Sequence, residues 1–168
     1  MHLEIGGQVF HPIHGVGKVV AIRSLAFDGK RPRLYYEVAL DKTTIWVLIE
    51  PQGIGRLRPI TPKSELARYR AVLKGRPTSL SDNFRARQSD LDVRLKLGTF
   101  QAICEIVRDL SARRVRKPLT DYELDLLKKA REFLFQEWAV INRVTSSEAA
   151  QSVEALLSEG RKNLEPSL

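Results

Sequence analysis

The chain has few of the features that stabilise secreted or membrane proteins. Its single cysteine, Cys104, excludes an internal disulfide, which favours a reducing compartment. No apolar run approaches the roughly 20 residues that a membrane span needs. The first residues show no basic region followed by an apolar one, as a secretory signal would. These absences predict a cytoplasmic protein with no membrane partner.

Signals for catalysis and for metal or cofactor binding are also missing. His11 and His14 lie three residues apart, but no cysteine or third ligand accompanies them, whereas zinc sites need a fuller ligand set. Gly15-Val16-Gly17 has no third glycine and no following helix, so it indicates a turn and not a dinucleotide-binding loop. No Ser/His/Asp grouping with a nucleophile elbow occurs. We therefore predict a binding protein that is not an enzyme and uses no cofactor or metal.

What the chain does have is an excess of positive charge in its middle third. The net charge is +8 and the isoelectric point is about 9.9. Residues 61–117 hold fourteen basic and six acidic side chains, a net of +8, whereas residues 1–60 have a net of +3 and residues 118–168 a net of −3. Such a concentration of one sign favours a polyanionic partner.

Residues 1–60 have the pattern of a small β domain. The runs 18–22, 34–40 and 44–49 are rich in β-branched and aromatic residues, and Asp28-Gly29 is a hairpin-turn signal between apolar runs. Four or five short strands with tight turns predict a small antiparallel barrel of the SH3 or Tudor kind. The residues expected in its core are Val19, Ile22, Tyr36, Val38, Ile45 and Val47.

After a proline- and glycine-punctuated segment, 51–62, the composition becomes helix-forming, and we place the domain boundary near Ile60. Residues 61–168 predict an all-α domain of about five helices, so the fold class is α+β. Thr120 and Glu123 form a capping box before one helix, and Gly160 is expected to end the last one. The side chains expected to face inward are Leu66, Tyr69 and Leu73, then Phe100, Ile103, Ile106, Val107 and Leu110, then Leu124, Leu127, Phe133, Leu134 and Trp138, and finally Val153, Leu156 and Leu157.

One expected helix combines an aromatic ring with arginines. The N-cap candidates Ser81 and Asp82 place Phe84 at the start of this helix, beside Arg85 and Arg87. Two interpretations are open. Phe84 is the first core residue and the arginines are a solvated face, or the ring is a wedge against nucleic-acid bases and the arginines hold phosphates.

Nearly the whole chain resembles the CarD/CdnL group of bacterial RNA-polymerase-binding transcription regulators. The barrel pattern alone is shared with the polymerase-interacting domain of transcription-repair coupling factor. The pattern of the helical half makes the resemblance specific to the CarD/CdnL regulators. The matching residues are Ile5-Gly6, Val9, Pro12, His14-Gly15, Gly17, Val19, Ile22, Gly29, Tyr35-Tyr36 and Val38 in the first part, and Asn83-Phe84-Arg85, Arg87, Ile106-Val107-Arg108-Asp109-Leu110, Lys129-Ala130-Arg131, Leu134 and Glu137 in the second.

The resemblance implies that residues 1–60 bind the β subunit of RNA polymerase and that residues 61–168 meet promoter DNA at the upstream edge of the bubble. In this family an aromatic residue, usually tryptophan, wedges into the minor groove there, and Phe84 falls at that position. A phenyl ring lacks the indole N–H, so we expect weaker base preference. Leu25 and Val47 stand near positions that can be arginine in the family, so the polymerase contacts differ in detail.

The predicted function is therefore a transcription regulator that stabilises the open complex. The residues expected to bind DNA are Phe84, Arg85, Arg87, Arg94 and Lys96, and those expected to bind the polymerase are Arg23, Tyr35, Tyr36 and Trp46. We expect a monomer. The alternative is a Tudor-like adaptor that binds only proteins and has no direct DNA contact, its basic helices being a solvated face.

Overall fold

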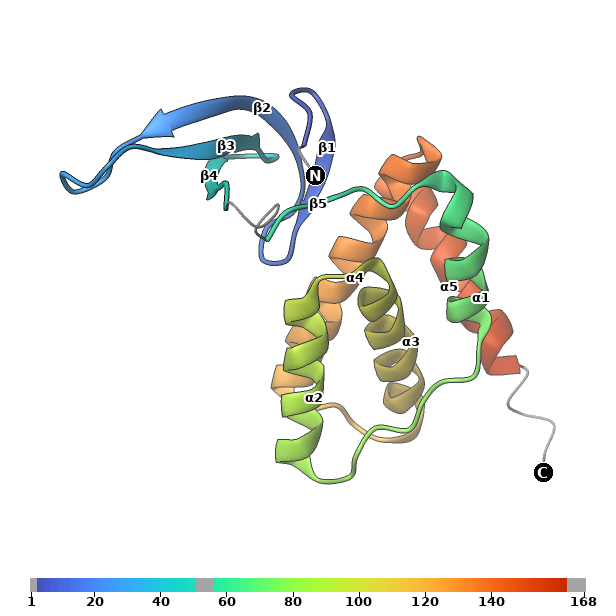
Figure 1. Ribbon diagram of the computed structural model, residues 1–168. Coiled ribbons are helices and arrows are strands. Elements are labelled where there is room, and N and C mark those ends of the chain that lie inside the picture. Colours follow the sequence, from blue (N-terminus) through green and yellow to red (C-terminus); the bar gives the residue numbers. More distant parts are fainter. Residues whose placement is uncertain (1–2, 51–55, 163–168) are drawn as a thin grey trace. The chain divides into compact units, whose positions relative to one another are not determined.

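The computed structural model describes residues 3–50 and 56–162, and the chain divides into two compact units, Met1–Ile60 and Thr61–Leu168 (Figure 1). Among the described residues the first unit holds five strands and the second five α-helices. The predicted α+β class is confirmed. No helix within the described ranges has the length and apolar character that crossing a membrane requires.

The first unit is an antiparallel sheet with the strand order β4-β3-β2-β1-β5. Its strands are β1 (Gln8–His11), β2 (Gly15–Leu25), β3 (Arg33–Ala39), β4 (Thr44–Leu48) and β5 (Arg58–Pro59). Over the residues described, β4 and β5 lie at the two edges and the sheet is not closed, so the predicted barrel is not confirmed. β5 lies in the proline- and glycine-punctuated segment 51–62, where the sequence predicted no strand. A two-residue strand that ends in proline carries no strand signal.

The core of the sheet lies on one face and contains most of the residues expected there. Val19, Tyr36 and Val38 are buried, and Ile45 and Val47 are partly buried against them. The prediction for Ile22 is wrong, since this side chain is 45% exposed. Ile22 pairs with Tyr36 and so lies on the same face of the sheet. However, β1 pairs with β2 only from Gly15 to Lys18, so beyond Lys18 the strand β2 has β3 as its paired neighbour.

The second unit begins with the 3-10 turn η1 (Lys63–Glu65) and continues with α1 (Leu66–Lys74), α2 (Phe84–Leu97), α3 (Phe100–Arg116), α4 (Asp121–Asn142) and α5 (Ser146–Lys162). The predicted capping box at the start of α4 is confirmed, with Thr120 Oγ1 accepting from Glu123 N and Glu123 Oε2 accepting from Thr120 N. Each pair satisfies a backbone N–H that the helix leaves free.

α3 lies at the centre of the helical unit, where it contacts α1, α2 and α4, while α5 packs on α1 and α4 (Figure 1). The inward positions predicted for α1, α3 and α5 are all buried. In α4 the prediction for Leu124 is wrong, because this side chain is 38% exposed and the neighbouring Leu126 is buried instead. α2 contacts α3 and lies at the edge of the unit, so its outer face is open to solvent.

The prediction that Gly160 ends the last helix is wrong, because this residue lies buried within α5. A Cβ atom at this position would lie 2.8 Å from Lys74 O, the last carbonyl of α1. Glycine is therefore required here by the close approach of two backbones and not by a helix terminus.

Candidate nucleic-acid interface

The N-terminus of α2 presents Phe84 to solvent. The N-cap is Asn83, whose Oδ1 accepts from Ala86 N at 3.0 Å, and not Ser81 or Asp82 as the sequence suggested. Ser81 Oγ instead accepts from Asn83 N at 3.2 Å. Phe84 is thus the first residue of the helix, and its side chain is 45% exposed. Of the two interpretations, the one that places the ring in the core does not fit this position.

Arg85 and Arg87, two residues apart, have opposite environments. Arg85 is exposed, and in the part of the chain that the structure describes no carboxylate pairs with it. Arg87 is 6% exposed. Its Nε donates to Glu123 Oε1, and its Nη1 donates to Ser81 O at 2.9 Å. The expected phosphate contact by Arg87 does not fit this placement, because the guanidinium is turned inward to a buried carboxylate.

The segment just before α2 is also tied to the turn between α3 and α4. Lys117 Nζ donates to Asp82 Oδ1 at 2.9 Å. This hydrogen bond and the charge of Lys117 lower the pKa of the Asp82 carboxyl, and the charges of Arg113 and Arg87 lower it further. The exposed Arg114 and Arg116 neighbour Lys117 in the chain. The basic cluster at the end of α3 therefore lies beside the segment that leads into Phe84.

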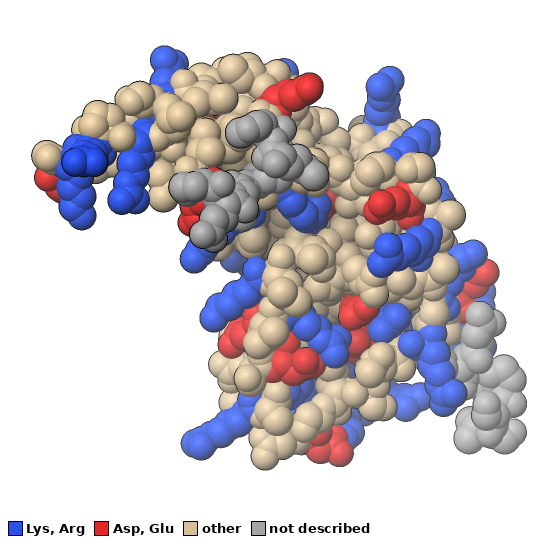
Figure 2. All heavy atoms as spheres, in the orientation of Figure 1, with Lys and Arg blue, Asp and Glu red and all other residues tan. Residues whose placement is uncertain are grey.

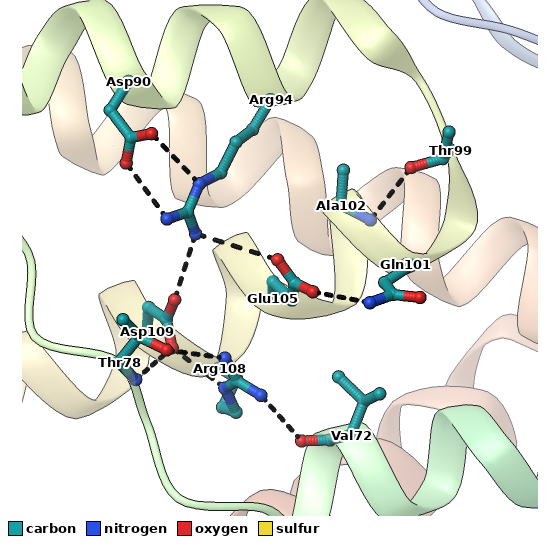
Figure 3. Close-up of polar contacts among 10 residues, drawn as sticks. All are labelled: Val72, Thr78, Asp90, Arg94, Thr99, Gln101, Ala102, Glu105, Arg108 and Asp109. Atoms are coloured by element: carbon teal, nitrogen blue, oxygen red, sulfur yellow. Dashed lines mark hydrogen bonds and ion pairs between the residues drawn. The ribbon is translucent and has the colours of Figure 1, made fainter.

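Arg94 belongs to an ion-pair network and is not a free cation (Figure 3). Its guanidinium lies 3.1 Å from Asp90 Oδ2 and 3.2 Å from Asp109 Oδ2. Asp109, buried on α3, also accepts from Thr78 N and from Arg108 Nε, both at 2.9 Å. The network joins α2 to α3 and holds the segment between α1 and α2, so the structure gives Arg94 a packing role.

Lys96 is exposed near the other end of α2. Twelve residues separate it from Phe84, which corresponds to about 18 Å along the helix axis. The five residues predicted to bind DNA therefore do not form one cluster. Phe84, Arg85 and Lys96 are available at the surface, whereas Arg87 and Arg94 are engaged inside the unit. On the face seen in Figure 2, basic side chains of the helical unit alternate with acidic ones.

Three of the four residues predicted to bind the polymerase share the outer face of the sheet. Arg23 pairs with Tyr35 across β2 and β3, and Glu37 pairs with Trp46 across β3 and β4. Arg23 Nε donates to Glu37 Oε2 at 3.1 Å, and Trp46 is 50% exposed. Tyr36 does not fit the prediction, because it points to the opposite face, is buried, and accepts from Leu3 N with its hydroxyl.

Beside the edge strand β4 the surface is hollowed, with a volume of about 470 Å³. Trp46 lines this hollow together with His11 and His14, whose ring centroids lie 4.9 Å apart. Burial, together with the charges of His14 and Arg56, lowers the pKa of His11 to about 4. His11 is therefore neutral at pH 7, and its Nδ1 accepts from Ile13 N. In the described ranges no three side chains are grouped as a metal ion would need.

Sequence reasoning missed the partners that hold these side chains. Glu123 was recognised as a helix cap but not as the partner of Arg87, and nothing local links two residues 36 positions apart. Lys117 lies in the basic middle third of the sequence, but nothing in the sequence placed it beside Asp82. These pairings depend on how α2, α3 and α4 pack together.

The comparisons with known proteins assign the chain to a family. Residues 69–154, which run from α1 into α5, match the model described as "CarD, C-terminal domain". The chain is also similar to the Bacillus subtilis (strain 168) protein named "Putative transcription factor YdeB", with 26% identity over 147 residues, 86% of this chain and 95% of that protein. The match to the domain model covers half of the sequence and includes Phe84, Arg87, Arg94 and Glu123. The chain belongs to the CarD family.

Proposed function

We propose that this chain is a transcription regulator that binds the β subunit of RNA polymerase through the sheet unit and promoter DNA at the upstream edge of the bubble through the helical unit, so that it stabilises the open complex. The observation that carries the proposal is the exposed Phe84 ring at the start of α2, next to the exposed Arg85. Membership of the CarD family and the name of the similar protein YdeB support a role in transcription.

The exposed ring and its charged neighbour suit a base step that is opening. An apolar side chain can lodge in a distorted step of the minor groove, and arginine can hold the adjacent phosphates. A step of this kind is available only when the duplex begins to melt. A side chain that binds one state better shifts the equilibrium by its differential affinity, so Phe84 would favour the open complex.

The sheet supplies the attachment to the polymerase in this proposal. β4 is an edge strand among the described strands, and an edge strand can pair with a strand of a partner through its backbone. The outer face beside it offers Trp46, Tyr35 and Arg23, an aromatic and cationic set of the type enriched at protein interfaces. Tethering raises the effective concentration of the helical unit at the promoter, so weak DNA contacts suffice.

Replacing Phe84 with alanine tests the wedge. If the ring contributes about 1.4 kcal/mol of preference for the open state, the lifetime of open complexes formed by the polymerase holoenzyme should fall about tenfold, while binding to the polymerase is unchanged. The matched control is Val93→Ala, which removes another exposed apolar side chain from α2. An unchanged lifetime for Phe84→Ala would contradict the wedge.

A protein-only adaptor remains the competing function, and crosslinking separates the two. A photoreactive phenylalanine analogue at position 84 should crosslink to promoter DNA only when the polymerase is present. Retained binding of the β subunit together with no crosslink to DNA would favour the adaptor.

A further inference from the structure

Glu123 is a buried carboxylate whose contacts exceed what a helix cap requires. It is 1% exposed in the first turn of α4. One oxygen, Oε2, accepts from Thr120 N at 3.1 Å and completes the capping box. The other, Oε1, is turned toward α2 and accepts from Arg87 Nε. The cap therefore uses only half of the carboxylate, and the other half bonds a residue of a different helix.

Arg87 extends this contact to the segment that precedes Phe84. Its Nη1 donates to Ser81 O at 2.9 Å and, more weakly, to Asp82 O at 3.4 Å. Its Cζ lies 5.8 Å from the centroid of the Phe84 ring, within the range of a cation–π contact. A single guanidinium thus links the start of α4, the backbone before α2 and the aromatic ring itself.

Compared with apolar residues in the same place, the pair adds little net stability. Removing two charges from water costs about as much as their attraction returns, so apolar residues of similar volume often serve a fold as well. What an ion pair with fixed hydrogen bonds adds is a defined geometry. The first turn of a helix frays easily. α2 makes its main helix contacts with α3, so the start of α2 has few restraints beyond the Asn83 cap and the exposed Asp82–Lys117 pair.

We propose that Glu123 and Arg87 are positioning residues that hold the first turn of α2, and with it the Phe84 ring, in the orientation that DNA binding needs. The role rests on the proposed function of Phe84. Arg87 acts through its contacts inside the unit and not as a phosphate ligand. A ring that is oriented before binding loses less conformational freedom on insertion, and apparent affinity scales with the fraction of molecules already in the competent orientation.

The experiment measures the affinity of the full chain for a fluorescein-labelled DNA duplex with a mismatched, unstacked step, by fluorescence anisotropy across a series of salt concentrations. If Glu123→Gln leaves one molecule in ten with the ring oriented, affinity falls about tenfold. The salt slope should not change, because no phosphate contact is lost. The matched control, Thr120→Ala, breaks the same capping box but leaves the pair with Arg87, and its affinity should stay within about twofold of the wild type.

A double-mutant cycle separates positioning from general damage to the fold. In a Phe84→Ala background, Glu123→Gln should cause no further loss of affinity, since the ring that it positions is gone. An equal loss with and without the ring would overturn the proposal. So would an increase in affinity for Glu123→Gln, because release of a phosphate-binding Arg87 would then be the better account. If Phe84→Ala itself has no effect on affinity, the wedge of the proposed function fails, and the positioning role fails with it.

A second variant covers the case in which Glu123→Gln does not fold. Arg87→Met combined with Glu123→Leu replaces both charges with apolar side chains of similar length, which a buried site usually tolerates. Thermal unfolding should resemble that of the wild type, yet affinity for the mismatched duplex should fall about tenfold. Wild-type affinity in this stable variant would overturn the positioning role.

Discussion

α2 carries two kinds of cation, and their difference shows how far a basic motif can be interpreted as a binding site. Arg87 and Arg94 point into the unit, where Glu123 and Asp109 bind them. Arg85 and Lys96 lie on the outside of the same helix. All four were expected to contact DNA, because in the sequence they form one basic stretch. Inside the fold, half of the positive charge of this stretch holds helices together.

Because of this difference, we expect substitutions of the inner pair, Arg87 and Arg94, to change stability. Substitutions of the outer pair, Arg85 and Lys96, should change the response of DNA binding to salt. A buried charge that loses its partner is costly, whereas an exposed cation contributes little to folding. Each phosphate contact that is lost lowers the slope of affinity against salt.

The largest effect is expected for Arg87→Ala. It leaves the Glu123 carboxylate buried without its cation, so the free energy of unfolding of the helical unit should fall by about 3–5 kcal/mol. Urea unfolding of the full chain, followed by far-ultraviolet circular dichroism, measures the change. Arg85→Ala is the matched control and should lie within about 0.5 kcal/mol of the wild type. Equal stability of the two variants would remove the distinction between inner and outer arginines.

A smaller effect is expected for Arg94→Ala. Asp109 keeps Arg108 and the Thr78 backbone N–H as donors, so no buried charge is left alone. The loss should be about 1 kcal/mol, as for a partly exposed ion pair, and should shrink at high salt. The same unfolding experiment at low and high salt tests it, with Ser89→Ala on the exposed face as the control. A loss as large as that of Arg87→Ala would show that burial of the ion pair does not determine how much stability each substitution removes.

The smallest change in stability is expected for the outer pair. Arg85→Ala and Lys96→Ala should leave the free energy of unfolding within about 0.5 kcal/mol of the wild type, yet each should lower the slope of log affinity against log salt by about 1. Filter binding to promoter DNA over a range of salt concentrations measures the slope. Arg94→Ala should keep the wild-type slope, and a reduced slope for that variant would place Arg94 at the DNA.

Local patterns in the sequence were sufficient for most of the helical unit. The capping box at Thr120 and the apolar stripe of α3 are set by residues three or four positions apart, and the structure confirms both. The wrong prediction for Leu124 shows the limit of such local patterns. Apolar residues on neighbouring positions, such as Leu124 and Leu126, leave the inward side of a helix ambiguous until the packing of its partners is known.

Long-range features could not be predicted in this way. The exposure of Ile22 depends on where β1 stops covering β2, and closure of the sheet depends on pairing between strands distant in sequence. The candidate site shows the same limit. Phe84 was correctly placed at the start of a helix, but which arginine remains free beside it is decided by Glu123, on another helix. Charge type is local information, whereas the partner of a charge is tertiary information.

The backbone contact at Gly160 bears on how the helical unit loses its structure. At Gly160 the end of α5 lies close to the last carbonyl of α1, so the first and last α-helices of the unit contact each other through main-chain atoms. Neither helix can detach without uncovering the other. Amide hydrogens of α1 and α5, although some 80 residues apart in the chain, should therefore exchange with solvent as one cooperative block.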